Sequence, residues 1–346
     1  MSTMSDLRFA IFGTGFWARF QLAAWRELQG AECVAFYNRT KSKAQALADE
    51  FGVPAVYDDP EELLAKEKLD FIDIITDVDT HSRFVHMAAE RSLAAICQKP
   101  MAPDFETAKQ MVETCRRAGV PLLIHENFRW QTPMRAFKQV LAEGRIGEVF
   151  RGRLAFNSSF PVFDNQPFLR DLEQFILTDV GSHVLDAARY LFGDAALLRC
   201  QTHSINPGIK GDDVATVMLQ TKAGATVVCE MSYATNSEHQ RFPETFIFAE
   251  GTQGTAELAP DHWIRVTTEE GTFARRVPPP RYAWADPAYD IVHASIVPCN
   301  EDLLLTLQGR KTAETDASDN IRTVELVFAS YDSAASGQTV EVGKAR

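Results

Sequence analysis

Long apolar runs and an excess of basic residues are both missing from this chain. No apolar stretch approaches the roughly 20 residues that a membrane span requires, so we expect no membrane partner. The opening MSTMSDLRFAIFG lacks a basic segment followed by a long apolar one, and we expect no signal peptide. Lys and Arg total 35 against 47 Asp and Glu, a net charge of −12. Because phosphate contacts need a basic surface, we expect no nucleic-acid partner.

Cysteines at metal-binding or disulfide spacing are also absent. The six cysteines are scattered without a CxxC motif. Four of them fall inside apolar, strand-like segments: Cys33, Cys97, Cys200 and Cys229. Buried, reduced thiols of this kind suit the cytosol. The sequence therefore predicts a cytoplasmic protein with no metal centre and no disulfide framework.

The order of apolar segments predicts an α/β protein of two domains, as 346 residues also favour. Up to Glu126, short apolar runs alternate with helical patterns, as in a doubly wound parallel sheet. From Glu148 onward, strand-like runs follow one another, which indicates an open-faced, largely antiparallel sheet. We predict a dinucleotide-binding Rossmann domain over 1–127. A C-terminal α/β domain for substrate binding and oligomerisation is predicted over 128–346, with its last helix packing back on the first domain.

Individual elements follow from the same patterns. Helices are predicted at 16–28, 41–51, 81–91, 105–117, 133–143, 179–192, 291–307 and 320–335. The proline-rich segment 275–287 is predicted to be an ordered connection or a lid. The acidic pairs Asp70/Asp73 and Asp212/Asp213 occur at strand starts or turns, and we predict structural roles for them.

A glycine-rich turn, Gly13-Thr14-Gly15-Phe16-Trp17-Ala18, follows the first predicted strand and opens the first predicted helix. Glycines in a GxGxxA turn allow a tight bend and let backbone N–H groups approach a pyrophosphate at the N-terminus of a helix. An ordinary turn is the alternative, but this position in an alternating β/α chain favours a dinucleotide site.

The end of the second strand bears on the choice between NADP and NAD. An acidic residue there would bind the ribose 2′-hydroxyl of NAD, whereas this chain has Asn38-Arg39-Thr40-Lys41. Arg39, with Lys41 or Lys43, could pair with the 2′-phosphate of NADP. Alternatively, Arg39 could stack on the adenine of either cofactor. The sequence favours NADP and leaves NAD open.

Two segments supply candidate catalytic groups. Lys99 follows the predicted strand AAIC, and ligands of such sheets bind beyond the carboxyl ends of the strands. The alternative for Lys99 is a solvated loop lysine.

Asp179, His183 and Asp186 are spaced to share one helix face. Histidine can accept a hydroxyl proton near neutral pH, while Asp179 could instead cap the helix; no HExxH motif or cysteine set supports zinc there.

These motifs together resemble the Gfo/Idh/MocA oxidoreductase family, through GTGFWA at 13–18, QKP at 98–100 and the Asp-x-x-x-His-x-x-Asp pattern from Asp179. The resemblance covers nearly the whole chain and implies a Rossmann domain followed by an open-faced α/β domain. It also implies a catalytic trio of Lys99, Asp179 and His183. The residues expected at the cofactor, besides the glycine turn, are Asn38, Arg39, Thr76, His81, Gln98 and Lys99.

Two positions depart from the family's pattern. Gln98 stands where the family usually has the glutamate of Glu-Lys-Pro, and Asp77-Val78 stands where it usually has Pro-Asn. Within the family, the segments ICQKP, HENFRWQ, NQPF, FILTDVGSH and SYAT resemble enzymes that oxidise a branched aldofuranose at its anomeric carbon to a lactone. That group carries an acidic residue at the position of Asn38, so a related sugar with another cofactor preference stays open.

The segment HENFRWQ ends the sixth predicted strand and is expected to face the ligand. Trp130 could stack on a sugar face, and Glu126 or Arg129 could bind hydroxyls. The alternative is a structural Arg–Glu pair between the domains. Asn157, on the polar face of its strand, is a further candidate for substrate binding.

The combined prediction is an NAD(P)-dependent oxidoreductase that oxidises a sugar or polyol hydroxyl by hydride transfer. His183 would be the base, and Lys99 would donate a hydrogen bond to the reacting oxygen. The alternatives are oxidation at another ring carbon or aldehyde reduction, a redox-cycling NAD-dependent glycosidase or lyase, and a non-enzymatic nucleotide-sensing protein. Because open apolar sheet faces rarely stay uncovered, we also expect a homodimer or homotetramer.

Overall fold

The chain forms two compact units in a computed structural model that describes residues 6–238 and 242–343. The first unit comprises the chain up to Glu126 together with 283–285 and 296–321, and the second comprises the remainder. Helices α9 (Asp290–Leu307) and α10 (Ala317–Ser336) are therefore each divided between the units. Residues 1–5, which begin the segment judged for a signal peptide, lie outside the described residues. Among the helices that are described, none is long and apolar enough to span a membrane.

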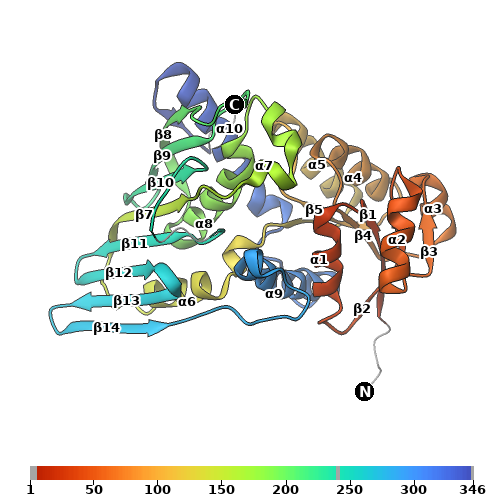
Figure 1. The fold of residues 1–346 in the computed structure, drawn as a ribbon, viewed down its shortest axis with the longest axis horizontal. Helices are drawn as coiled ribbons and strands as arrows, with labels where there is room; N and C mark the ends of the chain where they lie inside the picture. Colours follow the sequence, from red (N-terminus) through yellow and green to blue (C-terminus); the bar gives the residue numbers. More distant parts are fainter. Residues whose placement is uncertain (1–5, 239–241, 344–346) are drawn as a thin grey trace. The chain divides into compact units, whose positions relative to one another are not determined.

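The first unit is a doubly wound parallel sheet, whose described strands have the order β3-β2-β1-β4-β5-β6 (Figure 1). The strands are β1 (Leu7–Phe12), β2 (Ala31–Tyr37), β3 (Ala55–Tyr57), β4 (Phe71–Ile74), β5 (Ala94–Gln98) and β6 (Leu122–His125). The connecting helices are α1 (Phe16–Trp25), α2 (Lys41–Phe51), α3 (Pro60–Lys66), α4 (His81–Glu90) and α5 (Phe105–Ala118). β3 was not predicted, because three half-buried residues are too few to show a strand period.

This strand order brings the predicted cofactor residues to one edge of the sheet. The order reverses between β1 and β4, and in such sheets ligands bind beyond the carboxyl ends of the strands at that point. The glycine turn directly follows β1, and Asn38 directly follows β2. Lys99 directly follows β5, and Thr76 is the second residue after the end of β4. The parallel pairing of these strands places all four segments at the same edge. The predicted Rossmann fold is confirmed.

The second unit is built on a mixed sheet with the order β14-β13-β12-β11-β7-β10-β9-β8-β15 among its described strands (Figure 1). Only the β7–β10 pair is parallel in this part of the chain, so the sheet is largely antiparallel, as predicted. Its strands are β7 (Val149–Asn157), β8 (Ala195–His203), β9 (Val214–Thr221), β10 (Thr226–Ser232), β11 (Phe246–Gly251), β12 (Gly254–Ala259), β13 (Trp263–Thr268), β14 (Gly271–Arg276) and β15 (Val340–Glu341). The helices that precede α9 in this unit are α6 (Thr132–Ala142), α7 (Val162–Asn165) and α8 (Ser182–Phe192).

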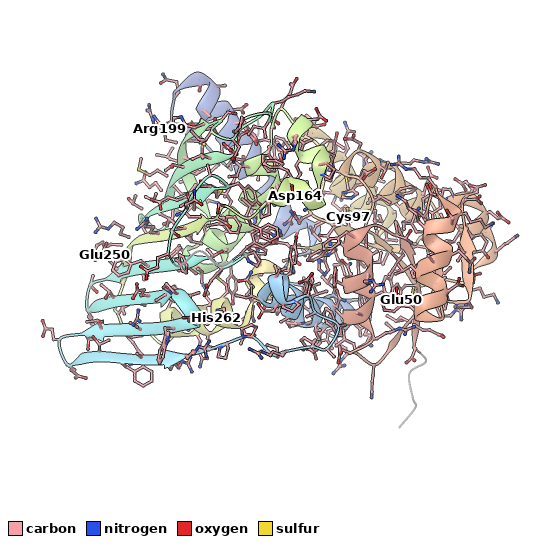
Figure 2. All side chains as sticks on the ribbon, viewed as in Figure 1. Glu50, Cys97, Asp164, Arg199, Glu250 and His262 are labelled. Carbon is pink, nitrogen blue, oxygen red and sulfur yellow. The ribbon has the colours of Figure 1, made fainter. Side chains whose placement is uncertain are left out.

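One face of this sheet packs on helices and the other is open. Apolar side chains of α6, α8 and α10 share a core with the inward residues of the strands. The outward residues include Met218 and Phe248, which are 47% and 38% exposed. Charged residues accompany them, among them Arg199 and Glu250, which Figure 2 labels. The predicted open face is therefore present, with apolar and charged side chains interspersed.

Two element predictions need correction. The predicted helix 179–192 is α-helical only from Ser182, because Leu177–Gly181 forms a π-helical turn. The predicted loop 275–287 begins two residues too early, since β14 continues to Arg276 by pairing with β13. Both errors come from hydrogen bonding that local residue patterns do not reveal.

Candidate active site

The glycine turn has the geometry of a pyrophosphate site. Gly13 has a φ of 98°, and a Cβ at this position would lie 2.5 Å from the carbonyl oxygen of Ile75, so only glycine fits between β1 and the end of β4. A Cβ at Gly15 would meet no described atom within 4 Å, which leaves space at the N-terminus of α1. The hydroxyl of Thr14 is buried and has no hydrogen-bond partner among the described residues. These features fit the phosphates of a bound dinucleotide.

At the end of β2, the basic side chains are paired with acidic ones. The side-chain oxygen of Asn38 accepts a hydrogen bond from the backbone of the glycine turn at 3.4 Å. The guanidinium of Arg39 lies 3.4 Å from a carboxylate oxygen of Asp77, and the ammonium of Lys41 lies 3.7 Å from Asp58. All four charged side chains are exposed, so these pairs are individually weak. They nevertheless reduce the positive charge available to a 2′-phosphate.

Lys99 is connected to the interior of the first unit by a line of hydrogen bonds. Its peptide bond to Pro100 is cis, and its backbone N–H donates to Oε1 of Gln98 at 2.9 Å. Nε2 of Gln98 donates to Oε1 of Gln21 at 2.9 Å. Nε2 of Gln21 in turn lies 2.8 Å from each carboxylate oxygen of Asp73. The side chain of Gln98, which is predicted to lie at the cofactor, therefore links the backbone of Lys99 to Gln21 and Asp73 in the interior.

His81 holds two of the predicted cofactor segments together. It is buried at the start of α4, where Nδ1 lies 3.1 Å from the carbonyl oxygen of Pro100 and Nε2 lies 3.1 Å from that of Thr76. Burial lowers the pKa of His81, while its backbone contacts act in the opposite direction. The imidazole thus braces the turn after β4 against the turn after β5, and a direct cofactor contact by His81 stays a prediction.

In the second unit, Asp179 lies in the π-helical turn that precedes α8. The extra residue in a π turn changes the angular relation of Asp179 to His183 from the one that four-residue spacing predicts in an α-helix. One carboxylate oxygen of Asp179 accepts a hydrogen bond from the hydroxyl of Tyr233 at 3.0 Å. Burial, followed by the nearby Asp179, raises the pKa of Tyr233 well above its usual value. Tyr233, which sequence reasoning missed, therefore stays protonated and donates to Asp179.

The ring of His183 is stacked on the ring of Phe128. The two ring centroids are 3.8 Å apart and the ring planes differ by 3°. Phe128 begins the short helix η2 (Phe128–Trp130), and His183 is in the first turn of α8. A parallel stack restricts rotation of the imidazole about its side-chain bonds, so it fixes the plane in which the nitrogen atoms lie.

A buried ion pair anchors this stack. Arg129 donates to both oxygens of Asp186, with distances of 2.7 Å from Nε and 2.6 Å from Nη2. Arg129 is 4% exposed and Asp186 is fully buried. Arg129 therefore has a structural partner within its own unit, and the predicted Arg–Glu pair between the domains stays a prediction. The Arg129 guanidinium serves the packing of η2 on α8.

The remaining substrate candidates differ in their surroundings. Glu126 is fully buried at the end of β6. Trp130 is 8% exposed, and the guanidinium of Arg135 lies 4.4 Å from its ring centroid, which covers one ring face. Asn157 is half-buried at the end of β7. Substrate contacts by these residues stay predictions.

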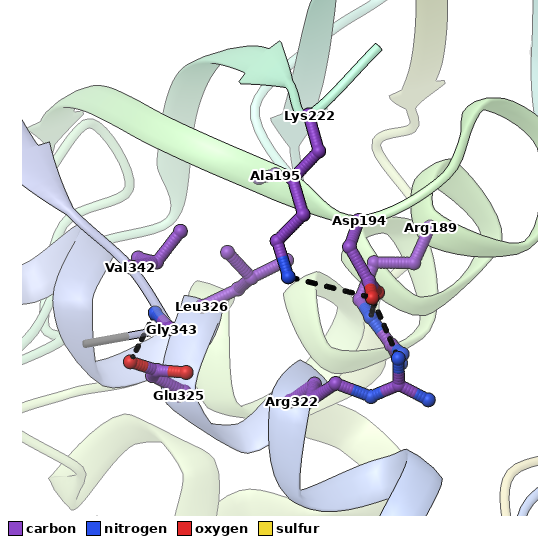
Figure 3. A pocket seen from close by; sticks show the side chains of 9 residues that line it. All are labelled: Arg189, Asp194, Ala195, Lys222, Arg322, Glu325, Leu326, Val342 and Gly343. Carbon is purple, nitrogen blue, oxygen red and sulfur yellow. Dashed lines mark hydrogen bonds and ion pairs between the residues drawn. The ribbon is translucent and has the colours of Figure 1, made fainter. Parts of the chain in front are cut away.

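A pocket in the second unit gathers charged side chains around Asp194 (Figure 3). Arg189 and Arg322 donate to Asp194 at 3.0 and 2.6 Å, and the ammonium of Lys222 lies 4.0 Å away. Burial would raise the pKa of Asp194, but the two guanidinium groups outweigh it and lower the pKa. None of the predicted site residues lines this pocket. We interpret the cluster as structural, joining α8 and α10 to the β9–β10 hairpin.

The fold and the glycine turn define a dinucleotide-binding protein, and comparison with known proteins gives its family and its class of reaction. Residues 7–126 match the oxidoreductase family model GFO/IDH/MocA, described as an NAD-binding Rossmann fold, and residues 134–274 match the GFO/IDH/MocA C-terminal domain. The chain belongs to the Gfo/Idh/MocA oxidoreductase family and is an NAD(P)-dependent enzyme. The predicted family resemblance is confirmed.

Three relatives are similar over almost the full chain. The D-apiose dehydrogenase of Rhizobium rhizogenes is 42% identical over 98% of this chain and 99% of that protein. The D-apiose dehydrogenase of Paraburkholderia graminis is 40% identical over 99% of this chain and 91% of that protein. A crystal structure of an oxidoreductase from Agrobacterium radiobacter, in complex with NAD+, L-tartaric acid and magnesium, is 42% identical. It matches with a TM-score of 0.96 over 98% of this chain and 99% of that chain.

Proposed function

We propose that this enzyme oxidises D-apiose, or a closely related aldose, at the anomeric carbon and forms the corresponding lactone. Two D-apiose dehydrogenases that are 42% and 40% identical over almost the whole chain support this substrate class. The observation that carries the reaction type is His183, a 7% exposed imidazole stacked flat on Phe128 and one turn from Asp179. A histidine with a fixed ring plane is suited to remove a proton from one particular hydroxyl.

The proposed mechanism assigns one role to each of the three catalytic candidates. His183 accepts the proton of the anomeric hydroxyl, while Lys99 donates a hydrogen bond to the same oxygen and stabilises the negative charge that develops on it. Asp179, oriented by Tyr233, supplies negative charge beside the histidine. A dinucleotide held at the glycine turn of residues 13–18 would supply the hydride acceptor for the sugar carbon. Positioned groups of this kind each contribute about 10²–10⁴-fold to the rate.

NAD is proposed as the preferred cofactor, in place of the NADP that the sequence favours. The pairing of Arg39 with Asp77 and of Lys41 with Asp58 lowers the positive charge at the end of β2. An excess of positive charge there would favour a 2′-phosphate. The structure of the Agrobacterium radiobacter relative in complex with NAD+ supports the same choice.

A homo-oligomer and a cytoplasmic location complete the proposal. The open face of the second sheet carries exposed Met218 and Phe248, and a second copy of the chain would cover them. The six cysteines remain thiols, as in proteins of a reducing compartment. Light scattering coupled to size-exclusion chromatography would test the oligomer, and a monomeric mass would contradict it.

Turnover with a panel of sugars tests the function. Purified enzyme would be mixed with D-apiose and other pentoses and hexoses, each with NAD or NADP, and followed at 340 nm. We expect NADH formation with D-apiose or a close relative, and loss of that activity in a folded His183→Gln variant. A redox-cycling glycosidase or lyase would instead convert its substrate without net NADH, and that result would overturn the proposal.

A further inference from the structure

A buried carboxylate in the Rossmann unit lies outside the proposed mechanism. Asp73 occupies the third position of β4 and is completely buried. Two side chains of α1 donate to it: Trp25 from Nε1 at 2.9 Å and Gln21 from Nε2 at 2.8 Å. Burial raises the pKa of Asp73 to about 7, while these hydrogen bonds act in the opposite direction. Above about pH 7, Asp73 is ionised, and an acceptor-only carboxylate stands at the base of the hydrogen-bonded line that reaches Lys99.

The direction of every hydrogen bond in this line follows from its two ends. A carboxylate can only accept, so Gln21 must turn its NH2 group to Asp73 and its Oε1 away. A backbone N–H can only donate, so Gln98 must turn its Oε1 to Lys99 and its NH2 group away. Between the two amides, the NH2 of Gln98 then faces the Oε1 of Gln21, and the 2.9 Å between these atoms fits a hydrogen bond.

Two further buried groups fit the same orientation. The Nε2 of Gln98 lies 3.4 Å from Nδ1 of His125, which gives its second hydrogen an acceptor. Nε2 of His125 lies 3.1 Å from Oδ1 of Asn300, so the histidine carries its proton on Nε2. The side-chain NH2 of Asn300 points back to the backbone oxygen of Gln21 at 3.5 Å. The half-buried side chain of Gln98 therefore has a consistent set of partners within the first unit.

We propose that Gln98 is a positioning residue for Lys99, and that glutamine occurs here because Asp73 sets the direction of the hydrogen bonds. The inference rests on the proposed role of Lys99. A glutamate at position 98 could still accept from the Lys99 N–H. Its other oxygen would face the Oε1 of Gln21, acceptor against acceptor, and it would add a second carboxylate to the buried network. A glutamate at position 98 is thus incompatible with an ionised Asp73 and the present orientation of Gln21.

The proposal predicts that two unfavourable substitutions compensate each other. In Asp73→Asn, Trp25 keeps the side-chain oxygen, and the new NH2 group requires Gln21 to reverse. A reversed Gln21 presents its NH2 group to position 98, where glutamine offers a donor but glutamate offers an acceptor. In the double variant Asp73→Asn/Gln98→Glu, the contact of Gln21 with the new NH2 group and its contact with position 98 are both complementary again, while His125 keeps its proton on Nε2 for Asn300.

A four-variant cycle tests this coupling by stability and by turnover. We expect Gln98→Glu and Asp73→Asn each to lower the unfolding temperature and to reduce kcat by about 10- to 100-fold, as misplaced catalytic groups do. The double variant should recover most of both losses. The matched control is Gln45→Glu with Asp49→Asn on the surface of α2, where Gln45 donates to Asp49 at 2.8 Å, and it should change neither quantity. Additive losses in the buried cycle would overturn the proposal.

A second cycle tests whether Gln98 acts through Lys99. In a Lys99→Met background, Gln98→Glu should cause no further loss of kcat, although it should still lower the unfolding temperature. An unchanged fold-loss in that background would mean a merely structural role. Gln98→Met breaks the line without adding charge; it should lower kcat similarly and gain nothing from Asp73→Asn. If Lys99→Met itself keeps full turnover, the proposed role of Lys99 fails. A loss of kcat in Lys99→Met together with a normal kcat in Gln98→Glu would refute this inference alone.

Discussion

Lys99 in the first unit is held through uncharged amides, whereas His183 in the second unit is held beside a buried ion pair. The amide line fixes a backbone position at the end of β5 through hydrogen bonds of defined direction. The ion pair of Arg129 and Asp186 instead fixes η2 on α8, and the stack with Phe128 fixes the imidazole plane. Amides can be reversed together, but a buried charge cannot lose its partner without a large cost. The two supports should therefore fail differently.

The largest expected effect is the loss of one partner of the buried ion pair. Asp186→Asn leaves the guanidinium of Arg129 without its carboxylate in a site that is 4% exposed, and should lower the free energy of unfolding by about 3–5 kcal/mol. Urea denaturation measures this loss. The control is Glu230→Gln in the exposed pair of Arg153 and Glu230, which should cost about 1 kcal/mol or less. Equal losses in the two variants would contradict the comparison.

Removal of the stacked ring should affect turnover more than stability. Phe128→Leu keeps an apolar side chain but frees the imidazole of His183, and we expect kcat to fall about 10- to 100-fold. Phe128→Tyr keeps the ring and should retain most of the activity. NMR spectra provide an independent measure, because ring-current shifts of the His183 ring protons should disappear in Phe128→Leu. Unchanged shifts in that variant would show that the stack does not form in solution.

The unusual pKa of Asp73 predicts how stability depends on pH. The pKa is raised from 3.8 to about 7, so the folded protein keeps this proton where the unfolded chain has lost it. The contribution of Asp73 to stability should therefore decrease as pH rises from about 4 to about 7, by up to about 1.4 kcal/mol per pH unit, and stay constant above that. Urea denaturation of the wild type and of Asp73→Asn at several pH values isolates the contribution of Asp73 to the free energy of unfolding. Parallel pH dependences would show that Asp73 is not protonated in this range.

The smallest expected effect concerns the cofactor. Asp77→Asn removes the acidic partner of Arg39, and we expect NADP use, measured as kcat/KM relative to NAD, to rise by roughly fivefold, as befits an exposed pair. Asp58→Asn provides the matched comparison at Lys41. A fall in relative NADP use in Asp77→Asn would contradict the proposed effect of the pair.

The parts of the site that sequence could predict are those with a local pattern. The GxGxxA turn, the strand before Lys99 and the spacing of His183 from Asp186 all occur within short segments, because neighbouring residues determine such elements. The hydrogen bonds and the ion pair that hold Lys99 and His183 could not be predicted in this way, because they join residues that are distant in the chain. Gln21 and Asp73 are 52 positions apart, and Arg129 and Asp186 are 57 apart. No periodicity marks such pairs.

The same reasoning explains why Asp73, predicted at a strand start or turn, is instead the third residue of β4. Asp70 and Asp73 were both predicted to be structural, and Asp70 indeed accepts from the backbone N–H of Arg8 at 2.7 Å. Asp73 differs because its side chain points into the interior, where α1 supplies the donors. The π-helical turn at Asp179 was missed for a related reason, since an extra residue in one helical turn leaves the apolar pattern of α8 unchanged.

Deuterium transfer tests the central claim most directly. D-Apiose labelled with deuterium at the anomeric carbon would be incubated with the enzyme and NAD, and the reduced cofactor analysed by mass spectrometry. Oxidation at that carbon predicts one deuterium in each reduced cofactor and one lactone formed for each. Unlabelled reduced cofactor, or loss of the sugar without reduced cofactor, would contradict the account.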